Sequence, residues 1–189
     1  MAAMVENAEG YPADGAPREA SGVSAYEVPE SDWRIWRELR LDALADAPYA
    51  FTEPLDKARA KTEADWRSWW SDAVRCGPRF IGLFDGAPVG MCAVCFPEDF
   101  GGAPLLINMW TSPKARGRGL GRAMLDACVE YCEQAGHPRF LLGVVEDNFP
   151  ARRLYESYGF VETGDSEPLD SDASKRVLWM AKQVVADHA

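Results

Sequence analysis

The segment 107–125 constrains the fold of this chain more than any other part of its sequence. It predicts an apolar strand, a Ser-Pro turn, a basic glycine-rich loop and an amphipathic helix in direct succession. Residues 116–122 of the loop are Arg-Gly-Arg-Gly-Leu-Gly-Arg. The N–H groups at the start of a helix have no intrahelical partner and lie at the positive end of the helix dipole. Because glycines let an anion approach such a backbone closely, the segment predicts a site for a phosphate or pyrophosphate.

The two common nucleotide-binding loops do not fit this segment. The chain has no Gly-Lys-Ser/Thr triplet, which excludes a Walker-type loop. Arg122 stands where a G-x-G-x-x-G loop beginning at Gly117 needs its third glycine. The preceding residues also predict a meander of hairpins rather than a βαβ unit. The structural alternative is an ordinary helix entry with solvated arginines, but three glycines and three arginines in residues 116–122 exceed what a turn needs.

Length and charge predict one globular domain preceded by a tail. A chain of 189 residues suits a single hydrophobic core. Residues 1–22 are rich in Ala, Gly, Pro and Glu, so we expect a disordered tail there and a single domain over 23–185. The net charge is −10, and the tail holds four acidic residues against one arginine, which leaves −7 for the domain. An acidic surface disfavours nucleic acid as a partner and is compatible with an amine.

Neither a membrane span nor a metal site is predicted. The chain has no apolar run of about 18 residues, and no basic stretch followed by an apolar one at its start. Its five cysteines are an odd number in a chain too large to need disulfides. Cys92 and Cys95 form a C-x-x-C, but residues three apart on a strand point to opposite faces, and no second pair accompanies them. We therefore expect a reduced, cytoplasmic protein without a metal.

Hydrophobic periodicity and chain-breaking residues predict the order β-α-α-β-β-β-α-β-α-β-β, an α+β pattern with a central mixed sheet. The expected strands are 23–28, 79–84, 88–96, 104–111, 139–145, 160–163 and 176–183. The expected helices begin at Trp33, Thr62, Leu120 and Asn148 or Pro150, and they end before Pro48, Gly77, Gly136 and Gly159. We expect a loop with a helical start at 49–61 and an acidic loop at 166–174.

Two motifs in this order resemble the GCN5-related N-acetyltransferase (GNAT) family. That family carries R/Q-x-x-G-x-G/A at the start of its central helix, which Arg116, Gly119 and Gly121 match. Residues 148–160 resemble the family's N-x-x-A-x-x-L-Y-x-x-x-G-F segment, and residues 39–51 are similar to its opening helix and loop. The resemblance extends over residues 23–185.

The resemblance implies the GNAT fold. This fold has a central mixed, mostly antiparallel sheet of six to seven strands, splayed between its fourth and fifth strands. About four helices complete a three-layer α/β/α arrangement. Pantetheine would lie in the gap between the strands 107–111 and 140–145 and would pair with their exposed backbone.

The implied activity is transfer of an acetyl group from acetyl-CoA to a primary amine by direct attack in a ternary complex. Tyr155 matches the tyrosine that protonates the leaving thiolate, and its alternative is a core aromatic. Asn148 matches the residue that orients the cofactor or this tyrosine, and it also suits a helix N-cap. The residues expected to contact acetyl-CoA are Met109, Trp110, Thr111, Arg116, Gly117, Arg118, Gly119, Leu120, Gly121, Arg122, Asn148 and Tyr155.

The general base and the acceptor are less defined by the sequence. Glu146 is the first candidate for the base and Glu98 the second, and either could be a plain solvated carboxylate. Phe51, Glu53 and Glu98 are the residues expected to bind the acceptor. The tryptophans Trp66, Trp69 and Trp70 fit the core better than a pocket.

The sequence is compatible with more than one acceptor and with more than one class of function. A small-molecule amine is the favoured acceptor, and a protein N-terminus or a lysine is the alternative. A non-catalytic acyl-CoA-binding module would lack the acid, so the presence of Tyr155 argues against it. We expect a monomer or homodimer that binds neither nucleic acid nor membrane.

Overall fold

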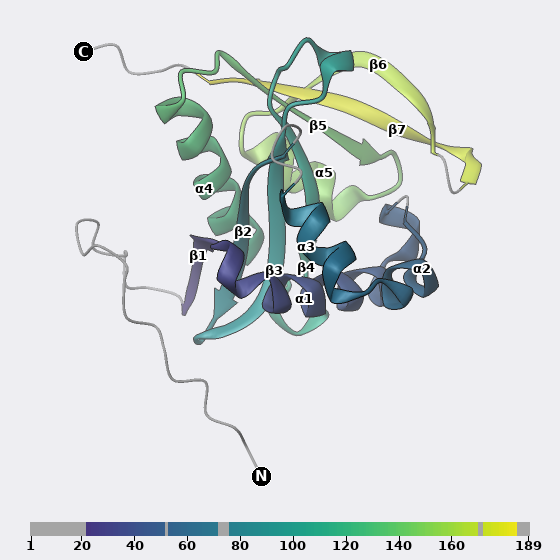
Figure 1. Cartoon of the computed structure of the whole chain (residues 1–189). Helices are drawn as coiled ribbons and strands as arrows, with labels where there is room; N and C mark the ends of the chain where they lie inside the picture. The colour runs from purple at the N-terminus through teal and green to yellow at the C-terminus, as the bar shows by residue number, and fades with distance from the viewer. Residues whose placement is uncertain (1–21, 52, 72–75, 170–171, 185–189) are drawn as a thin grey trace.

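The structure is a computed structural model that describes residues 22–51, 53–71, 76–169 and 172–184. One seven-stranded sheet has the order β1-β2-β3-β4-β5-β7-β6 (Figure 1). Its strands are β1 (Val23–Glu27), β2 (Cys76–Phe84), β3 (Ala87–Cys95), β4 (Leu105–Thr111), β5 (Arg139–Val145), β6 (Val161–Leu169) and β7 (Asp172–Gln183). Only β4 and β5 pair in parallel, and the other neighbours are antiparallel.

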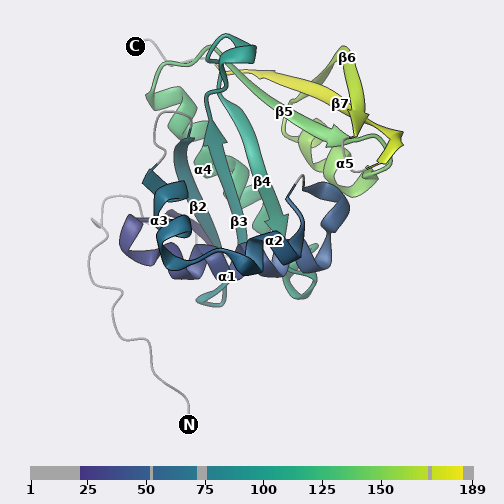
Figure 2. The ribbon, with the colours of Figure 1, turned by 45° about the vertical axis from the view of Figure 1, so that its right-hand side comes forward.

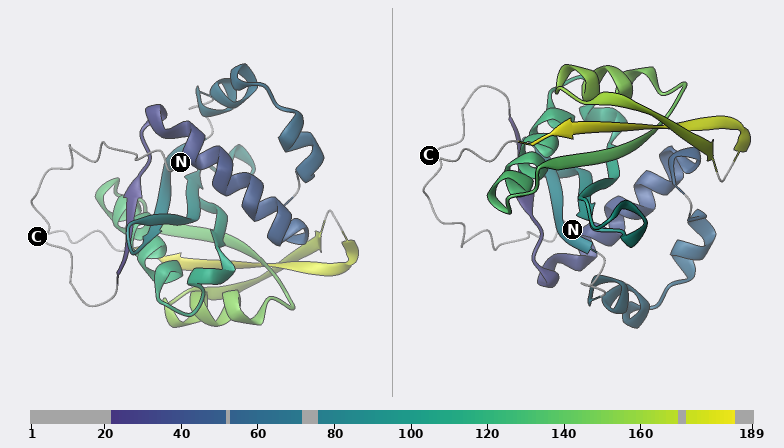
Figure 3. Two further views of the ribbon diagram at one scale, coloured as in Figure 1. Left: turned by 90° about the horizontal axis from the view of Figure 1, so that it is seen from below. Right: turned by 90° about the horizontal axis from the view of Figure 1, so that it is seen from above.

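Five α-helices in the described residues form the two outer layers. They are α1 (Trp33–Asp46), α2 (Leu55–Ala60), α3 (Glu63–Ser71), α4 (Leu120–Gln134) and α5 (Phe149–Ser157). Seen from below, α1, α2 and α3 lie on one side of the sheet and α5 on the other (Figure 3). The predicted α+β class, mixed sheet and α/β/α layers are confirmed. The described residues contain one α-helix more than the expected four, and the additional helix is α2.

The alternation of side chains along β3 divides the core in two. Cys92 and Val94 face α4 and α5, whereas Met91 and Ala93 face α1 and α3. On α4, the predicted helical stripe is fully buried: Leu120, Met124, Leu125, Cys128, Val129 and Cys132. Trp66 and Trp70 are buried against α1, as expected for core tryptophans.

Two sequence-based expectations change. The loop expected at 49–61 contains α2, and the acidic loop expected at 166–174 is wrong. There β6 and β7 continue as a hairpin, with Glu167 paired to Val177 and Pro168 to Arg176. Carboxylates on the exposed faces of these strands stay solvated, so an acidic composition does not prevent pairing. The tail expected at 1–22 lies outside the described residues except for Gly22.

Candidate active site

The strands β4 and β5 part shortly after they meet. They pair only at Leu105 with Leu141 and at Leu106 with Leu142. Both strands then continue, β4 to Thr111 and β5 to Val145, without pairing to each other (Figure 2). The backbone groups that face this gap are available to a ligand that pairs like a strand. The predicted splay between the fourth and fifth strands is therefore present.

A β-bulge lies at the start of the gap. Between the pairs Met91–Trp110 and Ala93–Ile107, two residues of β4 oppose one of β3. Asn108 in this bulge has φ of 57°, in the left-handed region. Asparagine is among the few residues other than glycine that tolerate this conformation. The sequence alone does not predict the bulge, since an Asn within an apolar run is compatible with an ordinary strand position.

The loop before α4 has the properties of an anion site. Gly117 and Gly119 adopt φ of 73° and 88°, and a Cβ on either would meet nothing within 4 Å. The intrahelical bond from Ala123 N to Gly119 O, 3.1 Å, is the first of α4, so the three preceding amides have no helical acceptor. Because the loop is exposed, an anion can reach these N–H groups directly.

The third glycine of the loop has another role. A Cβ on Gly121 would lie 3.0 Å from Leu154 Cδ2 and 3.5 Å from Met109 Cε. Gly121 therefore lets α4 pack closely against α5 and β4. This contact explains a glycine at that position without any ligand.

The arginines of the loop make different contacts. Arg116 donates from Nε to the carbonyl of Thr111 (3.0 Å) and from Nη2 to Asp46 Oδ2. The guanidinium of Arg118 lies over Phe84, and that of Arg122 lies over Tyr158. Arg116 thus fixes the loop to the end of β4 and to α1, and its charge is already paired.

Asp46 is a site residue that the sequence analysis missed. Besides Arg116, it accepts a hydrogen bond from Trp110 Nε1 at 2.9 Å. Trp110 is buried on the α1 face, so only its backbone can face the gap. A carboxylate at the last residue of a helix is unfavourable beside the negative end of the dipole. The unfavourable position of Asp46 in the sequence of the helix is therefore a signal that its carboxylate has partners outside the helix.

Asn148 and Tyr155 lie on α5. Asn148 caps this helix, because its Oδ1 accepts a hydrogen bond from Ala151 N at 3.3 Å. The Tyr155 ring packs in the core, 6.0 Å from the ring of Phe160, and the residue is 6% exposed. Burial raises the pKa of Tyr155, and the nearby Cys92 and Cys128 add to this effect. Among the described residues, its hydroxyl has no hydrogen-bond partner.

The candidate carboxylates do not converge. Glu146 follows β5, and its Oε1 accepts a hydrogen bond from Arg176 N at 3.0 Å. Glu98 is exposed in a 3₁₀ turn after β3, at the opposite end of the sheet. Glu53 pairs with Lys61 at 2.5 Å and with Arg40 at 3.5 Å.

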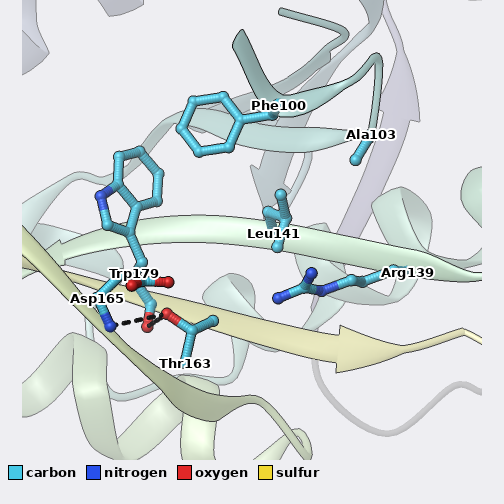
Figure 4. Close-up of a pocket in the computed structure, with 7 residues that line it drawn as sticks. All are labelled: Phe100, Ala103, Arg139, Leu141, Thr163, Asp165 and Trp179. Carbon is cyan, nitrogen blue, oxygen red and sulfur yellow. Dashed lines mark hydrogen bonds between the residues drawn. The ribbon is translucent and has the colours of Figure 1, made fainter.

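A pocket opens on the sheet face that α4 and α5 leave free. It has a volume of about 360 Å³ and is lined by Phe100, Ala103, Arg139, Leu141, Thr163, Asp165 and Trp179 (Figure 4). The ring of Trp179 lies 4.8 Å from that of Phe100 and packs over Gly143, where a Cβ would be 3.2 Å from it. Gly143 directly follows Leu142, the last residue of β5 that pairs with β4. The pocket therefore lies beside the paired stretch of β4 and β5, and the ring of Trp179 extends from it toward Gly143.

Within the described ranges, no three His, Cys, Asp or Glu side chains come together as a metal site. Of the helices in the same part of the chain, none is long and apolar enough to cross a membrane.

Known proteins are similar to this chain in sequence. Residues 33–160 match the family model described as the acetyltransferase (GNAT) family. Mycothiol acetyltransferase from Thermomonospora curvata is 30% identical over 132 residues, 70% of this chain and 41% of that protein. The mycothiol acetyltransferase from Frankia casuarinae is 32% identical over 158 residues, 77% of this chain and 43% of that protein. The chain spans less than half the length of these curated relatives.

Solved structures share the fold. The Salmonella typhimurium protein yncA, solved with its cofactor acetyl-CoA, superposes with a TM-score of 0.69 at 17% identity. The match includes 89% of this chain and 97% of that one. At this identity the likeness establishes the fold alone.

Proposed function

Since the chain belongs to the acetyltransferase (GNAT) family, we propose that it transfers the acetyl group of acetyl-CoA to the primary amine of a small molecule. The observation that carries this proposal is the gap between β4 and β5 with an anion site at the start of α4. A diphosphate at that helix end and a pantetheine along the β4 edge would suit the two features. The curated relatives named for a small thiol support a small acceptor.

The chemistry is attack of a neutral amine on a thioester carbonyl with departure of the CoA thiolate. The amides of residues 117–122 hold the diphosphate, and an N–H of β4 near Met109 or Trp110 polarises the carbonyl. Tyr155 donates a proton to the leaving sulfur. Burial raises the pKa of Tyr155, so the phenol is protonated in the resting enzyme. Because a thiol has an ordinary pKa near 8.5, donation to the thiolate depends on close positioning of the phenol beside the sulfur, and the tyrosinate then recovers a proton from water.

A base has to accept the proton of the attacking amine. Glu146 remains our candidate for this role, although one of its oxygens already accepts from Arg176 N. Glu98 is the alternative. A water molecule could relay the proton from the amine to Glu146, whereas Glu98, at the opposite end of the sheet, would need a longer chain of waters.

The proposal is tested by titrating the protein with acetyl-CoA in a calorimeter and by following CoA release with a panel of amines. We expect binding together with amine-dependent release. Binding without release would instead indicate a non-catalytic acyl-CoA-binding protein, and release only with peptides would indicate a protein acceptor.

The free cysteines Cys92, Cys128 and Cys132 support a reducing, cytoplasmic location, and we propose a monomer or homodimer.

We propose that the pocket beside Gly143 receives the body of the acceptor. Its aromatic walls suit an apolar group, and its two charged lining residues, Asp165 and Arg139, can pair with polar groups of either sign. Trp179→Ala is expected to raise the acceptor KM about 5-fold, since an aromatic contact contributes roughly 1 kcal/mol. Trp179→Phe keeps a ring and should behave nearly as the wild type. Steady-state kinetics with saturating acetyl-CoA measures both, and an unchanged acceptor KM in the alanine variant would place the acceptor elsewhere.

The contacts of Asp46 predict a role in shaping the anion loop. Asp46→Ala releases Arg116 and leaves the indole N–H of Trp110 without its acceptor. We expect acetyl-CoA to bind about 10-fold more weakly, because hydrogen bonds to a charged group contribute about 1.5–3 kcal/mol. Asp42→Ala removes the same charge from an exposed position of α1 and serves as the control. Calorimetry compares the two, and equal affinities would show that the loop holds its shape without Asp46.

A further inference from the structure

A buried arginine on α1 reaches the strand at which the gap begins. Arg40 is only 8% exposed, although its guanidinium is charged at all accessible pH values. Its Nη1 donates to Asn108 Oδ1 at 2.8 Å, its Nη2 lies 3.5 Å from Glu53 Oε2, and its plane lies over Phe51 at 4.4 Å. Burying a charge is unfavourable unless such contacts compensate it. The short bond to Asn108 is the strongest of them by distance.

The bond ends on the strained residue of β4. Asn108 holds its left-handed backbone conformation two residues beyond Leu106, where pairing with β5 stops. A left-handed non-glycine residue inside a strand persists only when its surroundings favour it. Arg40 is the polar partner of the Asn108 side chain, so it is the contact that can fix the bulge.

The bulge opposes a competing arrangement of the sheet. Beyond Leu106, both β4 and β5 carry unpaired backbone groups toward each other, and such edges tend to pair. A regular β4 would continue the parallel ladder toward Gly143 and Val145. That ladder would close the gap before any ligand entered it.

We propose that Arg40 is a positioning residue that holds the Asn108 bulge and thereby keeps the gap between β4 and β5 open. The effect of Arg40 on acetyl transfer rests on the proposed function, whereas its effect on the shape of the gap is independent of that function.

A second tie between the same helix and strand supports this role. Asp46 accepts from Trp110 Nε1, two residues beyond Asn108. Arg40 and Asp46 are separated by about 9 Å along α1, and the two strand residues by about 7 Å along β4. Helix α1 therefore holds β4 on both sides of Met109, and it does so from the face opposite α4.

Three substitutions at Asn108 separate the hydrogen bond from the backbone conformation. Asn108→Gly permits the left-handed conformation without enforcing it and loses the acceptor oxygen. Asn108→Leu disfavours that conformation and also loses the acceptor, and Asn108→Asp keeps both. We expect acetyl-CoA to bind about 10-fold more weakly to the glycine variant and about 100-fold more weakly to the leucine variant. The aspartate variant should recover most of the affinity, because it offers Arg40 an ionic acceptor. Arg40→Met should match the glycine variant.

Amide hydrogen exchange of residues 107–111 measures, without any ligand, whether the backbone of β4 is paired with β5. In the wild type, the N–H groups that face the gap should exchange rapidly, and in the glycine or leucine variant they should become protected as the ladder extends. If the glycine and methionine variants bind acetyl-CoA within about 2-fold of the wild type and show the wild-type exchange pattern, the proposal is wrong. Should the wild type fail to bind acetyl-CoA while the variants still gain protection, the bulge would retain its role and the acetyltransferase function would be refuted.

Discussion

Gly119→Glu is expected to weaken acetyl-CoA binding by two orders of magnitude or more. The new carboxylate would project from the N-cap of α4 into the open space beside the loop, where the diphosphate is proposed to bind. Two unit charges about 4 Å apart near a protein surface repel by about 4 kcal/mol. The substitution also places an L side chain at positive φ, which costs about 1–2 kcal/mol of stability. Isothermal titration calorimetry measures the affinity, and thermal melting checks the fold.

Two control variants separate charge from backbone strain. Gly136→Glu introduces the same residue at φ of 72° and in open space, but at the other end of α4. It should lose similar stability and keep its affinity for acetyl-CoA. Gly119→Asn tolerates the left-handed conformation without adding a charge, so its affinity should fall far less than that of the glutamate variant. If Gly119→Glu bound acetyl-CoA like the wild type, the diphosphate could not lie on this loop.

The parts of the site that the sequence predicted are those encoded by local pattern. The stripe on α4 and the glycines at 117 and 119 follow from helix periodicity and from the need for positive φ, and both depend on near neighbours in the chain. The capping role of Asn148 is local for the same reason. Family resemblance then added the mixed, mostly antiparallel sheet and its splay, which no local pattern contains.

The parts that the sequence did not predict depend on contacts between distant segments. Asp46 contacts Arg116 across 70 residues of chain and Trp110 across 64. Arg40 meets Asn108 across 68 residues. Helical periodicity shows that Arg40 and Asp46 do not belong to the apolar stripe of α1, but it does not show which residues they contact. The hairpin at β6 and β7 was missed for a related reason, since cross-strand pairs stabilise it more than its own strand propensity does.

The structure is compatible with both interpretations of Tyr155, as a core aromatic residue and as the acid that protonates the leaving thiolate. Its ring is a core aromatic, packed near Phe160, while its hydroxyl has no partner among the described residues. A core aromatic ring needs no hydroxyl for its packing, so a hydroxyl that makes no hydrogen bond in the core calls for another reason. A role as acid toward a sulfur in the gap would supply one.

Tyr155→Phe should therefore lower kcat about 100-fold, the usual contribution of a positioned general acid, and change the affinity for acetyl-CoA by less than about 3-fold. The ring and its packing are preserved, so the fold should not suffer. Because burial raises the pKa of Tyr155 above the ordinary value near 10, the wild-type phenol stays protonated throughout an assay range of about pH 6–9. The 100-fold difference should accordingly be the same at each pH in that range.

The matched control for Tyr155→Phe lies one turn further along the same segment. Tyr158 donates to Asp126 Oδ1 at 2.5 Å, a contact with α4 that is separate from the gap. Tyr158→Phe removes a hydroxyl of the same kind and should lower stability while leaving kcat within about 2-fold. Pre-steady-state measurement of CoA release then distinguishes chemistry from product dissociation. If both variants turned over at the wild-type rate, Tyr155 would be a core residue only, and water would have to protonate the thiolate.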